Sequence, residues 1–197
     1  MIEAIAAAGR EVWTRRSVVR GHIDSSIYLL FDEAEKSSVN LLVAAATDVL
    51  RGVLVAEEKV SVADSILATV PADQRKSVID LFKSPYYFAK HARKDPHEDI
   101  EIFISFCDFS IFLAISDYKI AYQKWSLRML IFAYWFRARH AAWLENYKGD
   151  LELHSVGWFD SDSSFGRAKS IIKHFDANPD EVKKIMADLN QNWIELP

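Results

Sequence analysis

The densest group of chemically capable side chains lies near the middle of the chain, between residues 86 and 97. The sequence there reads Tyr-Tyr-Phe-Ala-Lys-His-Ala-Arg-Lys-Asp-Pro-His. A histidine beside a phosphodiester can move protons at neutral pH, and a neighbouring cation stabilises the charge of the phosphorane. We therefore predict that His91 is a general acid/base and that Arg93 completes the catalytic pair of a metal-independent ribonuclease.

The remaining polar residues of this stretch are expected to bind or to position. The residues predicted to bind phosphate or RNA are Lys90, Lys94, His97 and Tyr87. On a helix, Tyr87, His91 and Lys94 would lie on one side. Asp95 and Pro96 are predicted to be structural, because the residue before a proline avoids the α-region and Asp95 can cap the next segment.

The same stretch also has a purely structural interpretation. Cationic side chains near a helix C-terminus are stabilised by the helix macrodipole, and His91 would then only form a hydrogen bond across the bundle. An exposed His91 in a basic cleft would favour RNA binding. A buried His91 paired with an acid such as Asp95 or Asp108 would favour the structural interpretation.

Other kinds of chemistry have no matching motif. The chain lacks Glu-x-x-His and His-Glu-x-x-His spacings, a cluster of cysteines and histidines, and a glycine-rich phosphate loop. We therefore expect no metal and no cofactor. Cys107, the single cysteine, lies in an apolar run and is predicted to be a buried thiol.

Composition narrows the class of protein. The 24 lysines and arginines against 28 aspartates and glutamates give a formal charge of −4, which argues against a protein that coats duplex DNA. One cysteine permits no intrachain disulfide, so we expect a cytoplasmic protein. Aspartate or glutamate interrupts the longest apolar run, 100–115, so that no membrane span is predicted.

The elements that must position these residues are predicted to be helices. Half of the 197 residues are apolar, whereas only six are glycine and five are proline. We predict an all-α bundle of about seven or eight helices. Its expected first helix covers 2–20 and ends at Gly21, a core helix covers 39–55, Pro85 begins the helix of the central stretch, and 126–146 form one aromatic helix.

We predict one domain with an appended hairpin. Residues 1–147 form the bundle core, 148–164 form a loop rich in Gly, Asp and Ser, and 165–197 form a C-terminal helical hairpin packed on the same domain. The two helices of that hairpin are expected over 165–175 and 179–190, separated by Asn178 and a proline suited to a first helical position.

Three runs together resemble an uncharacterised family of bacterial and phage-borne helical proteins. They are the alanine-rich run that starts at Ser38, the run from Phe88 to Pro96, and Tyr134-Trp135-Phe136. The resemblance covers roughly residues 22–145. More distantly, the layout is similar to HEPN domains, helical bundles that are often dimeric. Many serve in prokaryotic defence, and their active members are metal-independent ribonucleases.

This resemblance implies a protein that acts on or binds RNA in defence or stress response, and a homodimer formed through the aromatic helices. Two other functions stay open. One is a non-catalytic interaction module that binds a partner or a second copy through a tryptophan-rich surface. The other is a small-molecule sensor with a pocket among Tyr87, Phe112 and Trp135.

Overall fold

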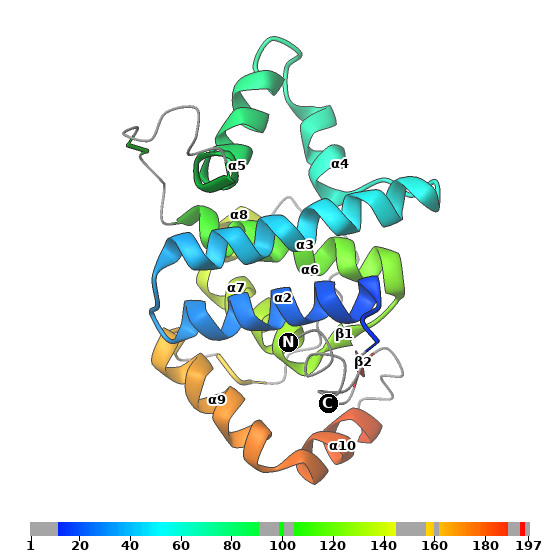
Figure 1. Ribbon diagram of the computed structural model, residues 1–197. Helices are drawn as coiled ribbons and strands as arrows, with labels where there is room; N and C mark the ends of the chain where they lie inside the picture. Colours follow the sequence, from blue (N-terminus) through cyan, green and yellow to red (C-terminus); the bar gives the residue numbers. More distant parts are fainter. Residues whose placement is uncertain are drawn as a thin grey trace, which may run out of the picture.

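The prediction of an all-α protein is confirmed by a computed structural model. The structure describes residues 12–90, 99–100, 105–144, 157–159, 162–188 and 194–195. Within them lie nine helices and two short strands, labelled as in Figure 1. They are α2 (Arg15–Phe31), α3 (Lys36–Ala56), α4 (Val62–Thr69), α5 (Arg75–Lys90), α6 (Ser105–Tyr122), β1 (Trp125–Ser126), α7 (Leu127–Arg139), α8 (Ala141–Leu144), α9 (Phe165–Ala177), α10 (Pro179–Asp188) and β2 (Ile194–Glu195).

The expected first helix, 2–20, lies partly outside the described residues; within them, α2 begins at Arg15 and ends later than expected. Thr14 caps α2, because its side chain accepts a hydrogen bond from the Ser17 backbone N–H at 3.0 Å. The helix then runs through Gly21 to Phe31, so the predicted end at Gly21 was wrong. Its buried stripe continues on both sides of that glycine, with Val19, Ile23, Ile27 and Leu30. Packing of this stripe outweighs the modest cost of a glycine inside a helix.

The body of the molecule is formed by α2, α3, α6 and α7. Helices α2 and α3 pack along each other, and both contact α6 (Figure 1). From Met129 to Phe136 every residue of α7 is buried. The many apolar residues of this helix therefore reflect its full burial inside the chain. Its rings are used inside one chain, so the homodimer stays a prediction and would need other contacts.

The aromatic helix is also shorter than the expected 126–146. Ser126 caps α7 by accepting a hydrogen bond from the Met129 N–H at 3.1 Å. The helix ends at Arg139, and a new short helix, α8, begins at Ala141. The break falls at His140, which has a non-helical backbone and pairs with Asp108 of α6.

Helices α4 and α5 stand on one side of the body and lean away from it (Figure 1); residues 62–90 are called the α4–α5 arm below. The predicted helix start at Pro85 was wrong, because α5 runs through this proline to Lys90. Proline removes one backbone hydrogen bond and crowds the preceding turn. The apolar spacing continues across it, however, with Val78, Phe82 and Tyr86 lining one cavity.

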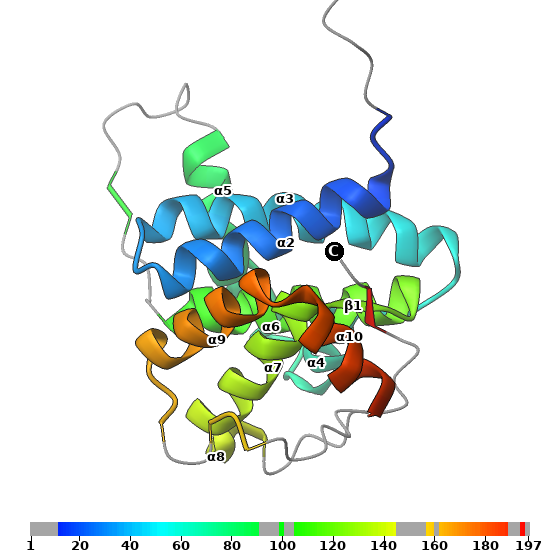
Figure 2. The same cartoon turned by 90° about the horizontal axis from the view of Figure 1, so that it is seen from below.

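The C-terminal helices cover the opposite side of the body. Helix α9 contacts α2 and α7, and α10 contacts α9 (Figures 1 and 2). Strand β2 pairs in parallel with β1, so that Ile194 lies opposite Trp125 and Glu195 opposite Ser126.

Among the described residues, α3 alone has the length and apolar composition of a membrane-crossing helix, with a mean hydropathy of 1.7. About 33% of that apolar window is buried within the chain, and a core helix of a soluble protein meets the same criteria.

Candidate ligand pocket

Most of the predicted RNA site lies outside the described residues. This applies to His91, Arg93, Lys94, Asp95, Pro96 and His97, whereas Lys90 ends α5 and only its backbone is described. Tyr87 is 46% exposed on α5, and its ring centroid lies 6.0 Å from that of Tyr86. The proposed catalytic geometry therefore stays a prediction.

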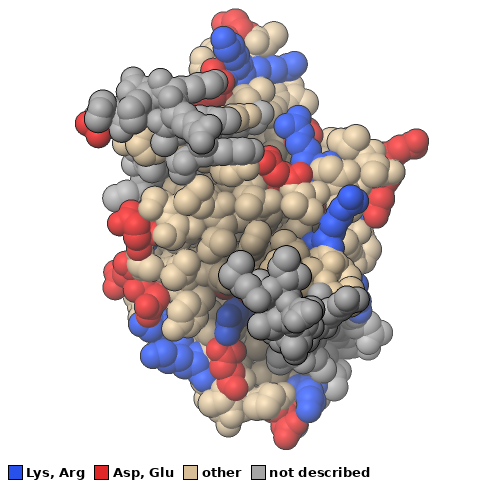
Figure 3. Space-filling view, viewed as in Figure 1, with Lys and Arg blue, Asp and Glu red and all other residues tan. Residues whose placement is uncertain are grey.

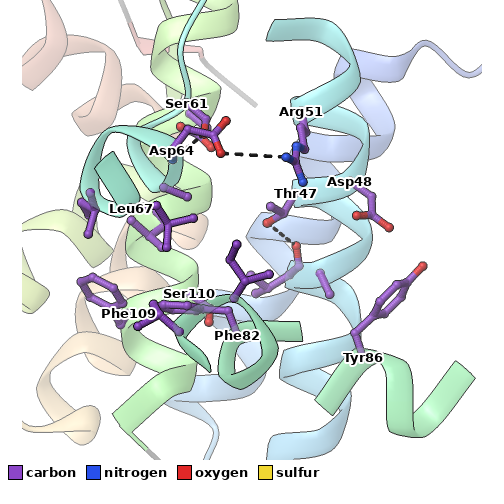
Figure 4. Close-up of a pocket in the computed structure, with 18 of the residues that line it drawn as sticks. Thr47, Asp48, Arg51, Ser61, Asp64, Leu67, Phe82, Tyr86, Phe109 and Ser110 are labelled. Atoms are coloured by element: carbon purple, nitrogen blue, oxygen red, sulfur yellow. Dashed lines mark hydrogen bonds and ion pairs between the residues drawn. The ribbon is translucent and has the colours of Figure 1, made fainter. Parts of the chain in front are cut away.

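The described residues instead enclose a cavity of about 210 Å³ between α3, α4, α5 and α6 (Figure 4). A dry apolar cavity of about 150 Å³ suffices to bind benzene. The apolar lining comes from all four helices: Val43 and Ala44 of α3, Ala63, Ile66 and Leu67 of α4, Val78, Ile79, Phe82 and Pro85 of α5, and Phe109 and Leu113 of α6. The space is large enough for a small organic molecule.

The cavity follows from side-chain size and helical spacing. Residues 44, 47, 48 and 51 recur at intervals of three and four on α3, so they share one face of that helix. Ala44 and Thr47 are small there, and Ala63 is small on the facing helix α4. Because short side chains meet, the gap between these helices is not filled.

A buried acid lies in the wall of the cavity. Asp117 of α6 is 2% exposed, and its Oδ1 accepts a hydrogen bond from the Val62 backbone N–H at 2.7 Å. Burial disfavours the charged form and raises the pKa of Asp117 to about 6; the Val62 N–H opposes this shift, and the Asp64 carboxylate adds to it. Asp117 thereby joins α6 to the first turn of α4.

A second buried polar group lines the same cavity. Asn40 of α3 is 7% exposed, and among the described residues its side-chain amide interacts with the Cys107 thiol but has no oxygen acceptor at its nitrogen. The neighbouring Cys107 thiol is only a weak acceptor. A buried donor without any partner costs on the order of 1–3 kcal/mol, and a weak acceptor such as a thiol offsets only part of that cost.

The rim of the cavity is polar (Figure 4). Arg51 of α3 and Asp64 of α4 form an exposed ion pair across it, with Nη2 and Oδ1 3.9 Å apart. The Thr47 hydroxyl donates a hydrogen bond to the Val43 carbonyl at 2.9 Å. Asp48 lies one residue further along the same helix and is exposed. These groups could orient a ligand, although exposed ion pairs contribute little stability.

The pocket predicted among Tyr87, Phe112 and Trp135 is not found at that place. Phe112 is stacked on Phe136 with ring centroids 4.6 Å apart, and Trp135 is fully buried and donates to the Ser163 carbonyl at 2.6 Å. These rings belong to the core. The tryptophan-rich surface remains a prediction.

Two further predictions from the sequence can be compared with the structure. Cys107 is buried, as expected, and burial raises the pKa of its thiol. Asp108, considered as a partner of His91, pairs with His140 instead, with Oδ2 and Nε2 3.1 Å apart. Among the described residues no group of three His, Cys, Asp or Glu side chains is placed to hold a metal ion.

Sequence reasoning did not select Asp117. The available signal was an acid inside the apolar run Phe-Leu-Ala-Ile-Ser-Asp-Tyr, since a buried acid must find a partner. Asn40, Thr47 and Asp48 are polar residues within the apolar run 39–55, and all three line the cavity.

On the face shown in Figure 3, uncharged residues occupy the middle, and basic and acidic side chains are interspersed around the edge. This distribution gives no continuous basic surface among the described residues of that face. Comparisons with protein-family models, with curated proteins and with solved structures found no match to the chain.

Proposed function

We propose that this chain is a helical protein that binds a small, largely apolar organic molecule in the cavity between α3, α4, α5 and α6. The observation that carries the proposal is the cavity of about 210 Å³, whose apolar wall comes from four helices and includes the buried side chains of Asn40 and Asp117. Ligand sites are typically concave and apolar, with a few placed polar groups.

The packing around the cavity supports a site rather than a local defect. Protein interiors are packed as densely as organic crystals, and the voids in them rarely exceed the size of a water molecule. The aromatic core around Phe112 and Phe136 is packed in that way, with rings stacked at an interplanar angle of 9°. The cavity lies where the body contacts the α4–α5 arm.

The arm itself is well suited to respond to a ligand. It contacts the body through α3 and α6, the two body helices that line the cavity. A bound molecule would add apolar contacts between arm and body, and each buried methylene contributes about 0.8 kcal/mol. Binding should therefore hold the arm against the body, which is the behaviour expected of a sensor.

The test uses tert-butylbenzene as a neutral apolar probe, followed by isothermal titration calorimetry and by amide chemical shifts. We expect saturable binding of one molecule to the wild type. Ala44→Phe should abolish it, because the new ring fills the cavity. Ala56→Phe is the matched control, since Ala56 is exposed at the end of α3, away from the cavity. Absence of binding to the wild type, or equal binding by Ala44→Phe, would overturn the proposal.

RNA cleavage is the second candidate. It is favoured by the observation that α5 continues without a break to Lys90, so one helix leads from the cavity into the cationic stretch. In this proposal His91 is the general acid/base and Arg93 stabilises the phosphate. Active HEPN domains carry an Arg-His motif with four to six intervening residues, whereas Arg93 and His97 are separated by only three. Roles in defence and dimerisation would follow only from that resemblance.

A further inference from the structure

We propose that the ligand of this pocket is an organic cation. Its apolar part would lie between the α4–α5 arm and helices α3 and α6, and its ammonium group would lie beside Asp117. This inference rests on the proposed function and names the chemical class of its ligand.

The first argument is the charge of the lining. Its charged residues are the acids Asp48, Asp64 and Asp117 and the single base Arg51. Because Arg51 pairs with Asp64 at the rim, the described lining keeps an excess of negative charge. The groups that act on Asp117 are the Val62 N–H and the like-charged Asp64 carboxylate. A buried carboxylate is costly without a positive partner, which a ligand ammonium group would supply.

The second argument is the aromatic part of the wall. Tyr86 and Phe82 of α5 and Phe109 of α6 line the cavity, and the ring centroids of Phe82 and Phe109 lie 5.8 Å apart. Aromatic faces attract cations, with a contribution of about 0.5–2 kcal/mol that rises when water is excluded. Neutral apolar ligands gain no such term. The same aromatic wall that accepts an apolar ligand therefore favours a ligand that also carries a positive charge.

The third argument concerns the length of the ligand. Asn40 adjoins Cys107, at the start of α6, whereas Asp117 lies ten residues further along that helix. At 1.5 Å per residue this corresponds to about 15 Å along the helix axis. The two buried polar groups thus lie toward opposite ends of the pocket. They fit an elongated molecule with a cation at the Asp117 end and an uncharged part at the Asn40 end.

The experiment compares phenyltrimethylammonium with tert-butylbenzene, two molecules of the same shape that differ in charge, by calorimetry at pH 8. The ammonium compound keeps its charge at every pH. We expect the wild type to bind it at least tenfold more tightly than the neutral isostere. Asp117→Asn should remove this preference and leave binding of tert-butylbenzene within about twofold. Asp48→Asn, at the exposed rim, is the matched control and should retain most of the preference for the ammonium compound.

The outcomes separate the two proposals. Equal affinity for the two probes in the wild type, or an unchanged preference in Asp117→Asn, would overturn the cation inference while ligand binding itself stands. Failure of the wild type to bind either probe would overturn both. If Asp117→Asn does not fold, the wild type still decides the matter with benzenesulfonate as a third probe. We expect no binding of this anion, and binding as tight as that of the cation would overturn the inference.

Discussion

Asp117 should lower the stability of the folded protein at neutral pH, and Asp117→Asn should restore it. Burial raises the pKa of this carboxyl to about 6 in the folded protein, from an ordinary value of 3.8. Between these two values the folded state holds the proton and the unfolded state does not. The contribution of Asp117 to stability is therefore most favourable below pH 3.8, decreases as the pH rises, and becomes constant above about pH 6.

The size of the effect follows from the shift. A difference of about 2.2 pH units at 1.36 kcal/mol per unit corresponds to about 3 kcal/mol. Asparagine has nearly the same shape, and its Oδ1 can still accept the hydrogen bond from the Val62 N–H, which spans 2.7 Å in the native protein. Only the ionisation is removed. At pH 8 the carboxylate is charged and buried, so the stability of Asp117→Asn should exceed that of the native protein by the largest amount at this pH.

Urea unfolding at pH 4 and pH 8 measures this effect. The free energy of unfolding of the wild type, relative to that of Asp117→Asn, should fall by about 2.4 kcal/mol from pH 4 to pH 8, because the unfolded carboxyl is already more than half ionised at pH 4. Other buried acids such as Asp24 and Asp108, whose pKa values burial also raises, are present in both proteins and cancel in the difference. Asp73→Asn, an exposed change in the turn before α5, is the control. Parallel pH profiles of wild type and Asp117→Asn would refute the reasoning.

Four further substitutions test the core, the helix caps and the predicted RNA site. Ser126→Ala removes both a helix cap and the hydroxyl that donates to the buried Asp24 carboxylate, so thermal unfolding should show a loss of about 2–4 kcal/mol. Ser164→Ala, an exposed cap, should cost only about 1 kcal/mol. Phe136→Ala should cost about 3–5 kcal/mol in urea unfolding, because the ring is fully buried. His91→Ala should abolish cleavage of total RNA in EDTA at unchanged melting temperature; absence of cleavage by the wild type would refute the ribonuclease hypothesis.

The helices were predictable because apolar residues recur at the helical period over long stretches. The aromatic run 127–136 and the alanine-rich run 39–55 both lie within observed helices. Breaks were harder, since Gly21 and Pro85 are local stop signals that do not reveal the packing on either side. A buried stripe spans Gly21, and half-buried apolar side chains that line the cavity flank Pro85; in both places these tertiary contacts outweigh the local preference.

The cavity was less accessible to sequence reasoning than the helices that form it. An acid inside an apolar run, such as Asp117, indicates that a partner must exist, but the pairing with the first turn of α4 joins residues 55 positions apart. Likewise, Ala44 and Ala63 are unremarkable alone and leave a gap only because α3 and α4 face each other across it. The sequence predicted a site at residues 86–97 because reactive side chains are dense there. A binding cavity instead depends on which small side chains face each other in the folded protein, and the sequence does not show this directly.

The two proposed functions use the same helix, and this makes them separable by variants at its two ends. Helix α5 contributes Phe82 and Tyr86 to the cavity and ends at Lys90, where the cationic stretch begins. Ala44→Phe fills the cavity from α3 without changing α5, and His91→Ala changes the cationic stretch without changing the lining. If both activities exist and Ala44→Phe alters RNA cleavage, the effect must pass through the arm, since no residue of the stretch has been replaced. If only ligand binding exists, the stretch serves as the end of a helix whose function lies in its first three turns.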